Sequence, residues 1–240
     1  MKDITRTEKK YLTDERGLEY FLSRTGTLLE KDAYYHQKIH NVYFDNDANE
    51  IVRTSLEKPD FKEKLRLRAY EANGVLCPYS FLELKKKYKG VVYKRRLQLT
   101  LAQGNGILQN AYGDILTDCQ IGREIGAYML KTNCYPKQYI GYERFSFRGT
   151  EDENLRVTVD TALVSRTKGL GLCASVHDEP FGGQARFVIE IKATGGMPLA
   201  LVRLLTGMKM YPVSFSKYGK VYLKNMENEK RGGNVLCLTA

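Results

Sequence analysis

Hydrophobic and polar residues alternate along several short stretches of this 240-residue chain, with the period of two that is typical of β-strands. The alternation is clearest where Leu65, Leu67 and Ala69 stand between basic residues. This run and others like it predict strands at residues 4–12, 39–45, 62–70, 81–88, 91–96, 137–148, 155–165 and 187–194.

An apolar spacing of three and four residues predicts helices between these strands. Leu18, Phe21 and Leu22 recur at that spacing after Thr13 and Asp14, either of which can cap a helix that runs to about Arg24. Further helices or helical turns are predicted near residues 49–56, 99–108, 123–131, 197–205 and 211–225. The chain is therefore expected to be an α+β protein that is mainly β, with helices as outer supports.

No repeat, low-complexity tract or linker divides the sequence, so a single domain is expected over residues 1–226. Residues 227–240 are expected to form a C-terminal tail that need not be ordered. The glycine-rich stretch 167–184 contains Gly169-Leu170-Gly171, a fragment of a nucleotide-binding motif. It follows a strand but opens no helix, so it is interpreted as an ordinary loop or lid.

Composition narrows the class of partner. The chain has 38 Lys and Arg against 28 Asp and Glu, a formal net charge of +10, and 42% hydrophobic residues. The hydrophobic fraction can fill a core and argues against disorder. The excess of positive charge favours acidic partners: phosphate-rich ligands, nucleic acid or anionic lipid.

Five cysteines are odd in number, widely spaced and without a Cys-x-x-Cys pair. They are interpreted as reduced thiols of a cytoplasmic protein, with no zinc site. No apolar run approaches the roughly 18 residues that a membrane-spanning helix needs, and the N-terminus is too polar for a signal peptide.

The charged residues of the predicted strands share one face on each strand. Collected by parity, these faces hold Arg6, Lys10, Lys64, Arg66, Arg68, Lys85, Lys87, Lys94, Arg96, Arg144, Arg156 and Lys192, interleaved with Glu8, Glu83, Asp160 and Glu190. One interpretation is that the faces are simply solvated, as in many antiparallel sheets. The other is that they converge on one polyanion, because like charges on neighbouring strands repel unless something negative lies between them.

If the strands close into a barrel, a cationic interior must be filled by water and anions, since each unpaired buried ion costs on the order of several kcal/mol. Phosphate groups suit such a lining, because guanidinium groups bind them through two hydrogen bonds and lysines act as point charges. Carboxylates could then hold a divalent cation that bridges phosphate oxygens. Glu83 and Asp160 are interpreted as salt-bridge partners, and Glu8 and Glu190 are the better metal candidates.

An ordered set of motifs carries a family resemblance. It consists of Glu8-Lys9-Lys10-Tyr11, Tyr43-Phe44-Asp45, Lys64-Leu65-Arg66-Leu67-Arg68-Ala69-Tyr70, Glu83-Leu84-Lys85-Lys86-Lys87, Lys94-Arg95-Arg96, Tyr142-Glu143-Arg144, Arg156-Val157-Thr158-Val159-Asp160, Glu190-Ile191-Lys192 and Phe215-Ser216-Lys217-Tyr218. Together they resemble the VTC domain of polyphosphate polymerases, a branch of the triphosphate tunnel metalloenzymes. The resemblance covers roughly residues 4–225.

The resemblance implies a closed antiparallel eight-stranded β-barrel tunnel with supporting outer helices. It implies that a nucleoside triphosphate binds through its phosphates, with Glu190 as ligand of a divalent metal, Mn²⁺ or Mg²⁺. The implied phosphate-binding positions are Lys10, Arg66, Arg68, Lys85, Lys94, Arg144, Arg156 and Lys217, and Tyr142 and Ser216 would line the site. The strand faces add Lys64, Lys87, Arg96 and Lys192 as substrate contacts and Glu8 as a second metal candidate.

The implied activity is transfer of the γ-phosphate of ATP onto a polyphosphate chain. The first strand has Arg6 and a single Glu8 where the hydrolytic tunnel enzymes carry two alternating glutamates, which favours the polymerase branch. A tunnel triphosphatase and a polyphosphate-binding module without turnover stay open as alternatives. Nucleic-acid binding is disfavoured, because the basic residues alternate along strands and the chain has no Trp to stack on bases.

The expected partners are therefore ATP and inorganic polyphosphate, pyrophosphate or triphosphate. The sequence leaves open a membrane-protein partner that would accept the product.

Overall fold

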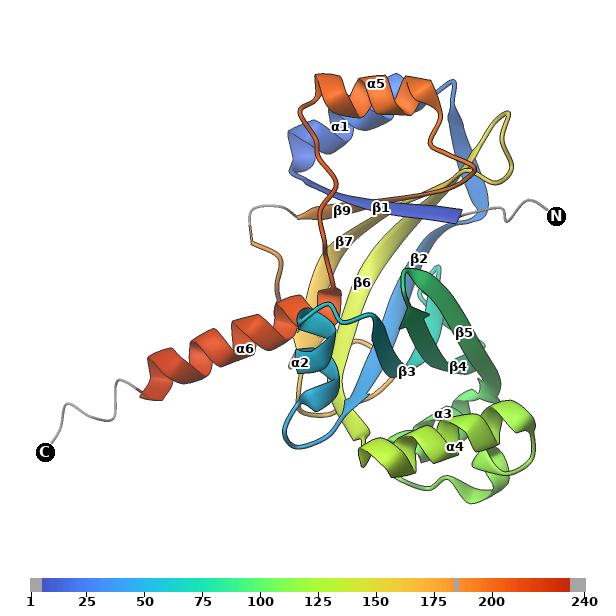
Figure 1. The fold of residues 1–240 in the computed structure, drawn as a ribbon, viewed down its shortest axis with the longest axis vertical. Helices are drawn as coiled ribbons and strands as arrows, with labels where there is room; N and C mark the ends of the chain where they lie inside the picture. Colours follow the sequence, from blue (N-terminus) through green and yellow to red (C-terminus); the bar gives the residue numbers. More distant parts are fainter. Residues whose placement is uncertain (1–5, 184–185, 234–240) are drawn as a thin grey trace, which may run out of the picture. The chain divides into compact units, whose positions relative to one another are not determined.

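The computed structural model describes residues 6–183 and 186–233 (Figure 1). Its strands are β1 (Arg6–Thr13), β2 (Leu29–Asp45), β3 (Phe61–Ala72), β4 (Val75–Tyr88), β5 (Val91–Thr100), β6 (Tyr135–Gly149), β7 (Arg156–Arg166), β8 (Glu179–Pro180) and β9 (Phe187–Thr194). Its helices are α1 (Glu15–Thr25), α2 (Glu50–Leu56), α3 (Leu101–Leu108), α4 (Gln120–Thr132), α5 (Leu199–Gly207) and α6 (Lys217–Gly233), with a 3₁₀ turn, η1 (Gly113–Leu116). The predicted mainly-β α+β class is confirmed.

The strands form one sheet in the order β1-β9-β7-β6-β2-β3-β4-β5, and the short β8 pairs with β7. The predicted closed eight-stranded barrel is not found in the described residues, because the strand order is an open path that ends at β1 and β5. A barrel closes only when its first and last strands exchange backbone hydrogen bonds. Alternation along a strand predicts which side chains share a face, but it carries no information on whether the end strands pair.

Most predicted elements occur close to their expected positions. β4 begins at Val75, six residues before the predicted strand, and α6 begins at Lys217, six residues after the predicted start. The largest difference concerns β2. β2 begins at Leu29, ten residues before the predicted strand. Residues 29–38 are polar on both faces and largely exposed, so they lack the alternation that predicts a half-buried strand.

α6 continues to Gly233, so residues 227–233 of the expected tail are helical. Ile4 and Thr5 of the first predicted strand, the side chain of Arg6, Gln184, Cys237 and residues 234–240 lie outside the described residues.

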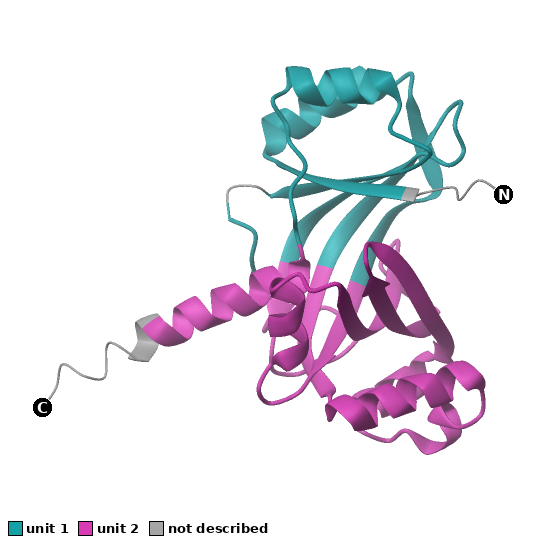
Figure 2. Ribbon diagram, viewed as in Figure 1, with its two compact units in different colours: residues 1–39, 142–163, 180–215 teal, residues 40–141, 164–179, 216–240 magenta. Residues whose placement is uncertain are grey.

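Two compact units divide the chain (Figure 2). Unit 1 comprises Met1–Ile39, Tyr142–Leu163 and Pro180–Phe215, and unit 2 comprises His40–Gly141, Val164–Glu179 and Ser216–Ala240. Each unit has its own cluster of buried apolar side chains. The expected single domain over residues 1–226 stays a prediction.

In unit 1, α1 and α5 lie side by side (Figure 1). Phe21 of α1 and Leu201 of α5 are fully buried in one apolar cluster with Ile189 of β9 and Val157 of β7. The carboxylate of Asp14 accepts a hydrogen bond from the backbone N–H of Gly17 at 2.9 Å, so of the two predicted capping residues, Thr13 and Asp14, it is Asp14 that caps α1. The apolar faces of β7 and β9 are therefore covered by this pair of helices.

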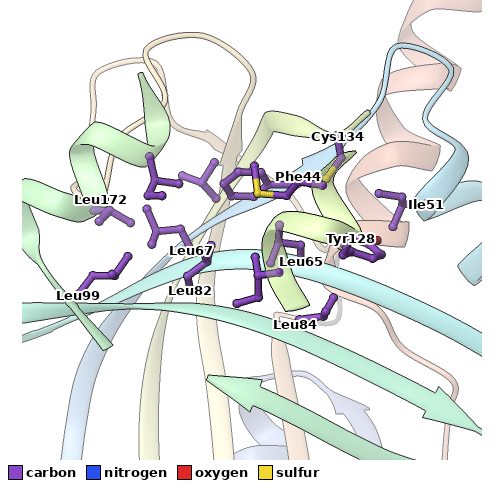
Figure 3. Close-up of a cluster of buried hydrophobic side chains, with 14 of the residues drawn as sticks. Phe44, Ile51, Leu65, Leu67, Leu82, Leu84, Leu99, Tyr128, Cys134 and Leu172 are labelled. Atoms are coloured by element: carbon purple, nitrogen blue, oxygen red, sulfur yellow. The ribbon is translucent and has the colours of Figure 1, made fainter. Parts of the chain in front are cut away.

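In unit 2, the odd-numbered apolar residues of β3 pack with even-numbered ones of β4, and α3 and α4 contribute to the same cluster (Figure 3). Leu65, Leu67, Leu82 and Leu84 are fully buried there. Because successive side chains of a strand point to opposite faces, the charged residues of β3 and β4 must lie on the other face. The hydrophobic core therefore decides where the cationic side chains stand.

Within the described residues, no helix combines the length and hydropathy needed to cross a bilayer. The four described cysteines, Cys77, Cys119, Cys134 and Cys173, are free thiols.

The core makes a stability prediction. Leu67→Ala should lower the free energy of unfolding by about 2–5 kcal/mol, because it removes a fully buried side chain and leaves a cavity. The matched control is Val91→Ala on the neighbouring hairpin, whose side chain is 55% exposed, and it should change the free energy by less than about 0.5 kcal/mol. Urea denaturation measures both, and equal effects would contradict this assignment of the core.

Candidate functional site

The charged faces of β3, β4 and β5 are in register. Arg66 of β3 pairs with Glu83 of β4, which in turn pairs with Arg96 of β5. The next row across the same three strands consists of Lys64, Lys85 and Lys94. The register therefore places these basic residues on one face of β3–β5, as predicted. The three adjacent lysines of the second row repel one another.

Glu83 is the only carboxylate of these two rows, and its side chain is 1% exposed. Its Oε2 atom accepts a hydrogen bond from Nε of Arg66 at 2.8 Å, and its Oε1 atom accepts one from Nε of Arg96 at 2.6 Å. Nζ of Lys94 lies 2.7 Å from the same Oε1. The predicted salt-bridge role of Glu83 is confirmed, and its three cationic partners leave it no role as a metal ligand.

Electrostatics around Glu83 follow from these contacts. Burial by itself would raise the pKa of this carboxyl, but Arg66, Arg68 and Lys94 outweigh burial and hold the pKa well below its usual range. Burial also lowers the pKa of Lys94, and the hydrogen bond to Glu83 only partly offsets this. We call Lys64, Arg66, Arg68, Glu83, Lys94 and Arg96 the Glu83 cluster.

Further polar groups hold the Glu83 cluster in place. Nε of Arg68, a residue that is 6% exposed, donates to Oδ1 of Asn41 at 2.7 Å. The hydroxyl of Tyr70 accepts from Arg68 at 3.5 Å and from Arg96 at 3.4 Å. Sequence reasoning missed Asn41 and Tyr70, because a single polar residue in a strand gives no signal of its burial.

The start of α6 also meets the Glu83 cluster. Nζ of Lys64 donates to Oγ of Ser216 at 3.1 Å, and the same oxygen accepts the backbone N–H of Gly219 at 3.2 Å. Ser216 therefore caps α6 and contacts the cluster through Lys64, while Lys217 begins the helix and is half-buried.

A second charged group lies in unit 1, on β1, β9 and β7. Lys10 pairs with Glu190, and Glu190 pairs with Thr158. The adjacent row is Glu8, Lys192 and Arg156. We call Glu8, Lys10, Glu190 and Lys192 the Glu190 cluster.

Lysines surround the carboxylate of Glu190. It forms an ion pair with Lys192, and its Oε2 lies 3.8 Å from Nζ of Lys10. Burial raises the pKa of Glu190, but Lys192 and Lys10 outweigh it and lower the pKa to about 2. Nζ of Lys10 also lies 3.5 Å from Glu8 and donates to the carbonyl of Phe215 at 3.2 Å.

Asp160 is fully buried and binds Arg144 through two hydrogen bonds of 2.6 and 2.8 Å. Burial lowers the pKa of Arg144, but Tyr142 and Asp160 outweigh it and raise the pKa well above its ordinary value. The guanidinium of Arg144 also lies 5.3 Å from the centre of the Tyr142 ring. The predicted salt-bridge role of Asp160 is confirmed.

Arg156 is half-exposed and forms an ion pair with Asp32 of β2. The predicted site residues thus fall into two sets, one in each unit. Unit 2 holds Lys64, Arg66, Arg68, Lys85, Lys87, Lys94, Arg96, Ser216 and Lys217, and unit 1 holds Glu8, Lys10, Tyr142, Arg144, Arg156, Glu190 and Lys192. Their roles in binding or catalysis stay predictions.

Glu8 and Glu190 are the predicted ligands of a divalent metal. No group of three or more His, Cys, Asp or Glu that could hold a metal occurs in the described part of the chain. Glu8 and Glu190 both approach the ammonium of Lys10, so two carboxylates converge on a position already held by a positive charge. Opposite Glu190, the buried hydroxyl of Thr158 lacks a hydrogen-bond partner among the described residues. Two carboxylates with a hydroxyl fit Mg²⁺ or Mn²⁺, which usually bind through one or two carboxylates plus substrate phosphates.

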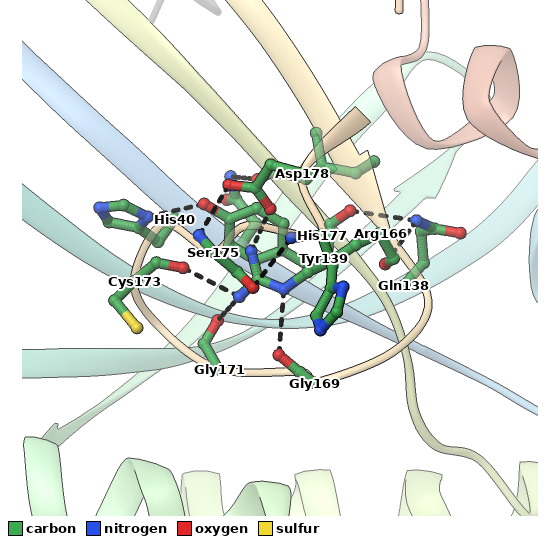
Figure 4. A network of polar contacts seen from close by, with 12 residues as sticks. His40, Gln138, Tyr139, Arg166, Gly169, Gly171, Cys173, Ser175, His177 and Asp178 are labelled. Carbon is green, nitrogen blue, oxygen red and sulfur yellow. Dashed lines mark hydrogen bonds and ion pairs between the residues drawn. The ribbon is translucent and has the colours of Figure 1, made fainter. Parts of the chain in front are cut away.

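A separate polar network in unit 2 holds the glycine-rich loop (Figure 4). The buried guanidinium of Arg166 lies 3.5 Å from the centre of the Tyr139 ring and donates to the carbonyls of Gly169 and Cys173 at 3.0 and 2.9 Å. It also forms an ion pair with Asp178. These contacts engage Arg166 with its own loop, so the network is structural, and no residue pattern predicted it.

Among known protein families, a model described as "VTC domain" matches residues 5–224. The search of curated proteins found no match. Among solved structures, a protein of Bacillus halodurans that is proposed to be an adenylate cyclase has a TM-score of 0.52 at 13% identity, covering 87% of this chain and 92% of that one. The PH1819 protein of Pyrococcus horikoshii OT3 has a TM-score of 0.49 at 14% identity, covering 92% of this chain and 99% of that one. The Bacillus structure shows a shared fold.

The Glu83 cluster makes a second prediction. Glu83→Gln should lower the free energy of unfolding by about 2–4 kcal/mol, because it leaves three cations without their common buried partner. Added salt should restore part of the loss by screening the repulsion. The control is Glu30→Gln, which removes an ion pair with Arg148 between two side chains that are each about half-exposed, and it should cost less than about 1 kcal/mol. Equal stability of the two variants would argue against the central role of Glu83.

The Glu190 cluster makes a third prediction, on pH dependence. The folded pKa of Glu190, about 2, lies below the ordinary value of 4.5, so its contribution is present above pH 4.5 and is lost as the pH falls toward 2. Over that window, the wild type should lose about 2–3 kcal/mol more of its unfolding free energy than Glu190→Gln does. Denaturation at a series of acidic pH values measures the difference, and parallel curves for the two proteins would refute it.

Proposed function

This chain belongs to the VTC domain family, and from that membership and the two charged clusters we propose that it is a polyphosphate polymerase. In the proposed reaction, the γ-phosphate of ATP is transferred onto a growing inorganic polyphosphate chain, and ADP is released. The reaction depends on a divalent metal and is expected to take place in the cytoplasm. A membrane-protein partner that accepts the product stays open.

The observation that carries the proposal is the register of the Glu83 cluster. The cluster holds five cationic side chains and one carboxylate, three of the cations contact that carboxylate, and Lys85 stands in the row of Lys64 and Lys94. A chain of phosphates supplies closely spaced negative charges that match such rows. Arg66 and Arg96 offer planar guanidinium groups, which bind phosphate oxygens through two hydrogen bonds, and the lysines act as point charges.

Phosphoryl transfer needs little covalent chemistry from the protein, because the acceptor is itself a phosphate oxygen. In the proposed mechanism, Arg66, Lys85 and Lys94 bind and orient phosphates and offset the repulsion between donor and acceptor. Glu8 and Glu190 would hold a divalent metal, which would supply positive charge to phosphate oxygens. Lys10 and Lys192, which contact these carboxylates, would bind phosphate as further point charges.

The decisive experiment incubates purified protein with ATP and Mn²⁺ or Mg²⁺ and resolves phosphate chains by gel electrophoresis. A ladder of long chains together with ADP is the expected result. Orthophosphate released from tripolyphosphate without chain growth would identify a triphosphatase, and binding without turnover would identify a polyphosphate-binding module.

Variants sharpen the test. Lys85→Ala should lower the rate of polyphosphate synthesis at least about tenfold with little change in stability, because Lys85 is exposed within the lysine row. The matched control is Arg95→Ala, an exposed arginine on the opposite face of β5 that bonds Glu124 at 2.8 Å. It should retain wild-type activity. If both variants were equally active, the charged face of β3–β5 would not be the site.

A further inference from the structure

Tyr43 of β2 is a buried group of unit 2 to which the proposed mechanism gives no role. The residue is 8% exposed, and its ring stacks on that of Tyr218 with 4.9 Å between the ring centres. Its hydroxyl accepts a hydrogen bond from Nη1 of Arg66 at 3.3 Å. Among the described residues, the hydroxyl of Tyr43 has no acceptor for its own proton.

Lys64, Arg66 and Arg68 of β3 act electrostatically on Tyr43, and Tyr218 of α6 stacks on its ring. Two carboxylates contact these neighbours: Glu83 of β4 binds Arg66, and Asp45 of β2 binds Tyr218. Both carboxylates are already engaged. Glu83 binds Arg66, Lys94 and Arg96. Asp45 accepts the hydroxyl of Tyr218 at 2.8 Å and the backbone N–H groups of Ile51 and Val52 at 3.0 Å each.

The phenol of Tyr43 is therefore influenced mainly by the positive charges of Arg66, Arg68 and Lys64. Burial raises the pKa of Tyr43, but Arg66, Arg68 and Lys64 outweigh burial and lower the pKa to about 8. For Tyr218 the balance is opposite: burial and Asp45 raise its pKa above the ordinary value of a tyrosine. Two stacked tyrosines thus differ in acidity because one faces guanidinium groups and the other a carboxylate.

We propose that Tyr43 is a further phosphate-binding group, whose hydroxyl donates a hydrogen bond to an anionic oxygen of the ligand, so that ligand binding fixes a proton on Tyr43. This inference rests on the proposed function, because it requires a phosphate chain at the Glu83 cluster. The phenolate oxygen gains its proton from solvent, and no covalent bond to the ligand forms or breaks. Above about pH 8, the phenolate of the unliganded protein acts as an internal anion beside Arg66 and Arg68.

The physical reason is competition for the same cations. A phosphate chain bound to Lys64 and Arg66 takes over the neutralisation of their charge and places negative charge beside the phenolate. Both effects raise the affinity of Tyr43 for a proton. The protonated hydroxyl then provides the donor that an anionic phosphate oxygen needs.

The experiment adds inorganic tripolyphosphate, without metal, to the full chain and records the ultraviolet absorption of tyrosine phenolate around pH 8, the pKa of Tyr43. Binding is measured in parallel by calorimetry. Wild-type protein should lose the absorption of up to one phenolate on binding, and the loss should grow as the pH rises through about 8. Tyr43→Phe keeps the ring that stacks on Tyr218, so it should fold, show no such loss and bind tripolyphosphate about tenfold more weakly.

Tyr70→Phe is the matched control, because the hydroxyl of Tyr70 also accepts hydrogen bonds from arginines of the cluster and its pKa is also lowered, since Arg68 outweighs burial and the opposing charge of Glu83. It should retain most of the phenolate loss. If tripolyphosphate binds the wild type without any loss of phenolate, or if Tyr43→Phe shows the same loss, the role of Tyr43 is refuted and the proposed function stands. If the wild type does not bind tripolyphosphate even after Mg²⁺ is added, the proposed function itself fails, and the role of Tyr43 fails with it.

Discussion

The repulsion between like charges on neighbouring strands is the constraint to which the rest of unit 2 responds. Lys64, Lys85 and Lys94 stand side by side across β3, β4 and β5. The neighbouring row adds the positive charges of Arg66 and Arg96. One buried carboxylate, Glu83, bonds both arginines and Lys94. This single negative charge reduces the repulsion between the cations but does not balance all of their charge. The face therefore keeps an excess of positive charge that an anion can compensate.

Glu83 and Glu190, the carboxylates after which the two clusters are named, differ in the cations that bind them. Glu83 is bound by guanidinium groups, whose planar donors fix a carboxylate in one geometry. Glu190 is bound by two ammonium groups, which act as point charges on flexible stems. The contrast separates Glu83, which anchors two arginines of its cluster, from Glu190, which is the proposed metal ligand.

The charged faces owe their position to the apolar faces behind them. In unit 2 the leucines of β3 and β4 pack with α3 and α4, and in unit 1 the apolar residues of β7 and β9 pack with α1 and α5. A shift of either strand pair by one residue would bury the cations and expose the core. The cost of that exchange fixes the register, and the register sets the rows in which phosphate would bind.

The sequence by itself determined the elements, the parity of each strand and the kind of partner, because alternation, capping residues and net charge are local properties. Lys85 and Glu190 could be assigned to charged faces on that basis. Only the tertiary structure decided that Glu83 has three cationic partners, that Tyr43 is buried against Arg66, and that β2 extends back to Leu29. It also decided that the sheet is open, contrary to the expected barrel. Strand pairing and burial depend on residues far apart in the chain, and no local pattern encodes them.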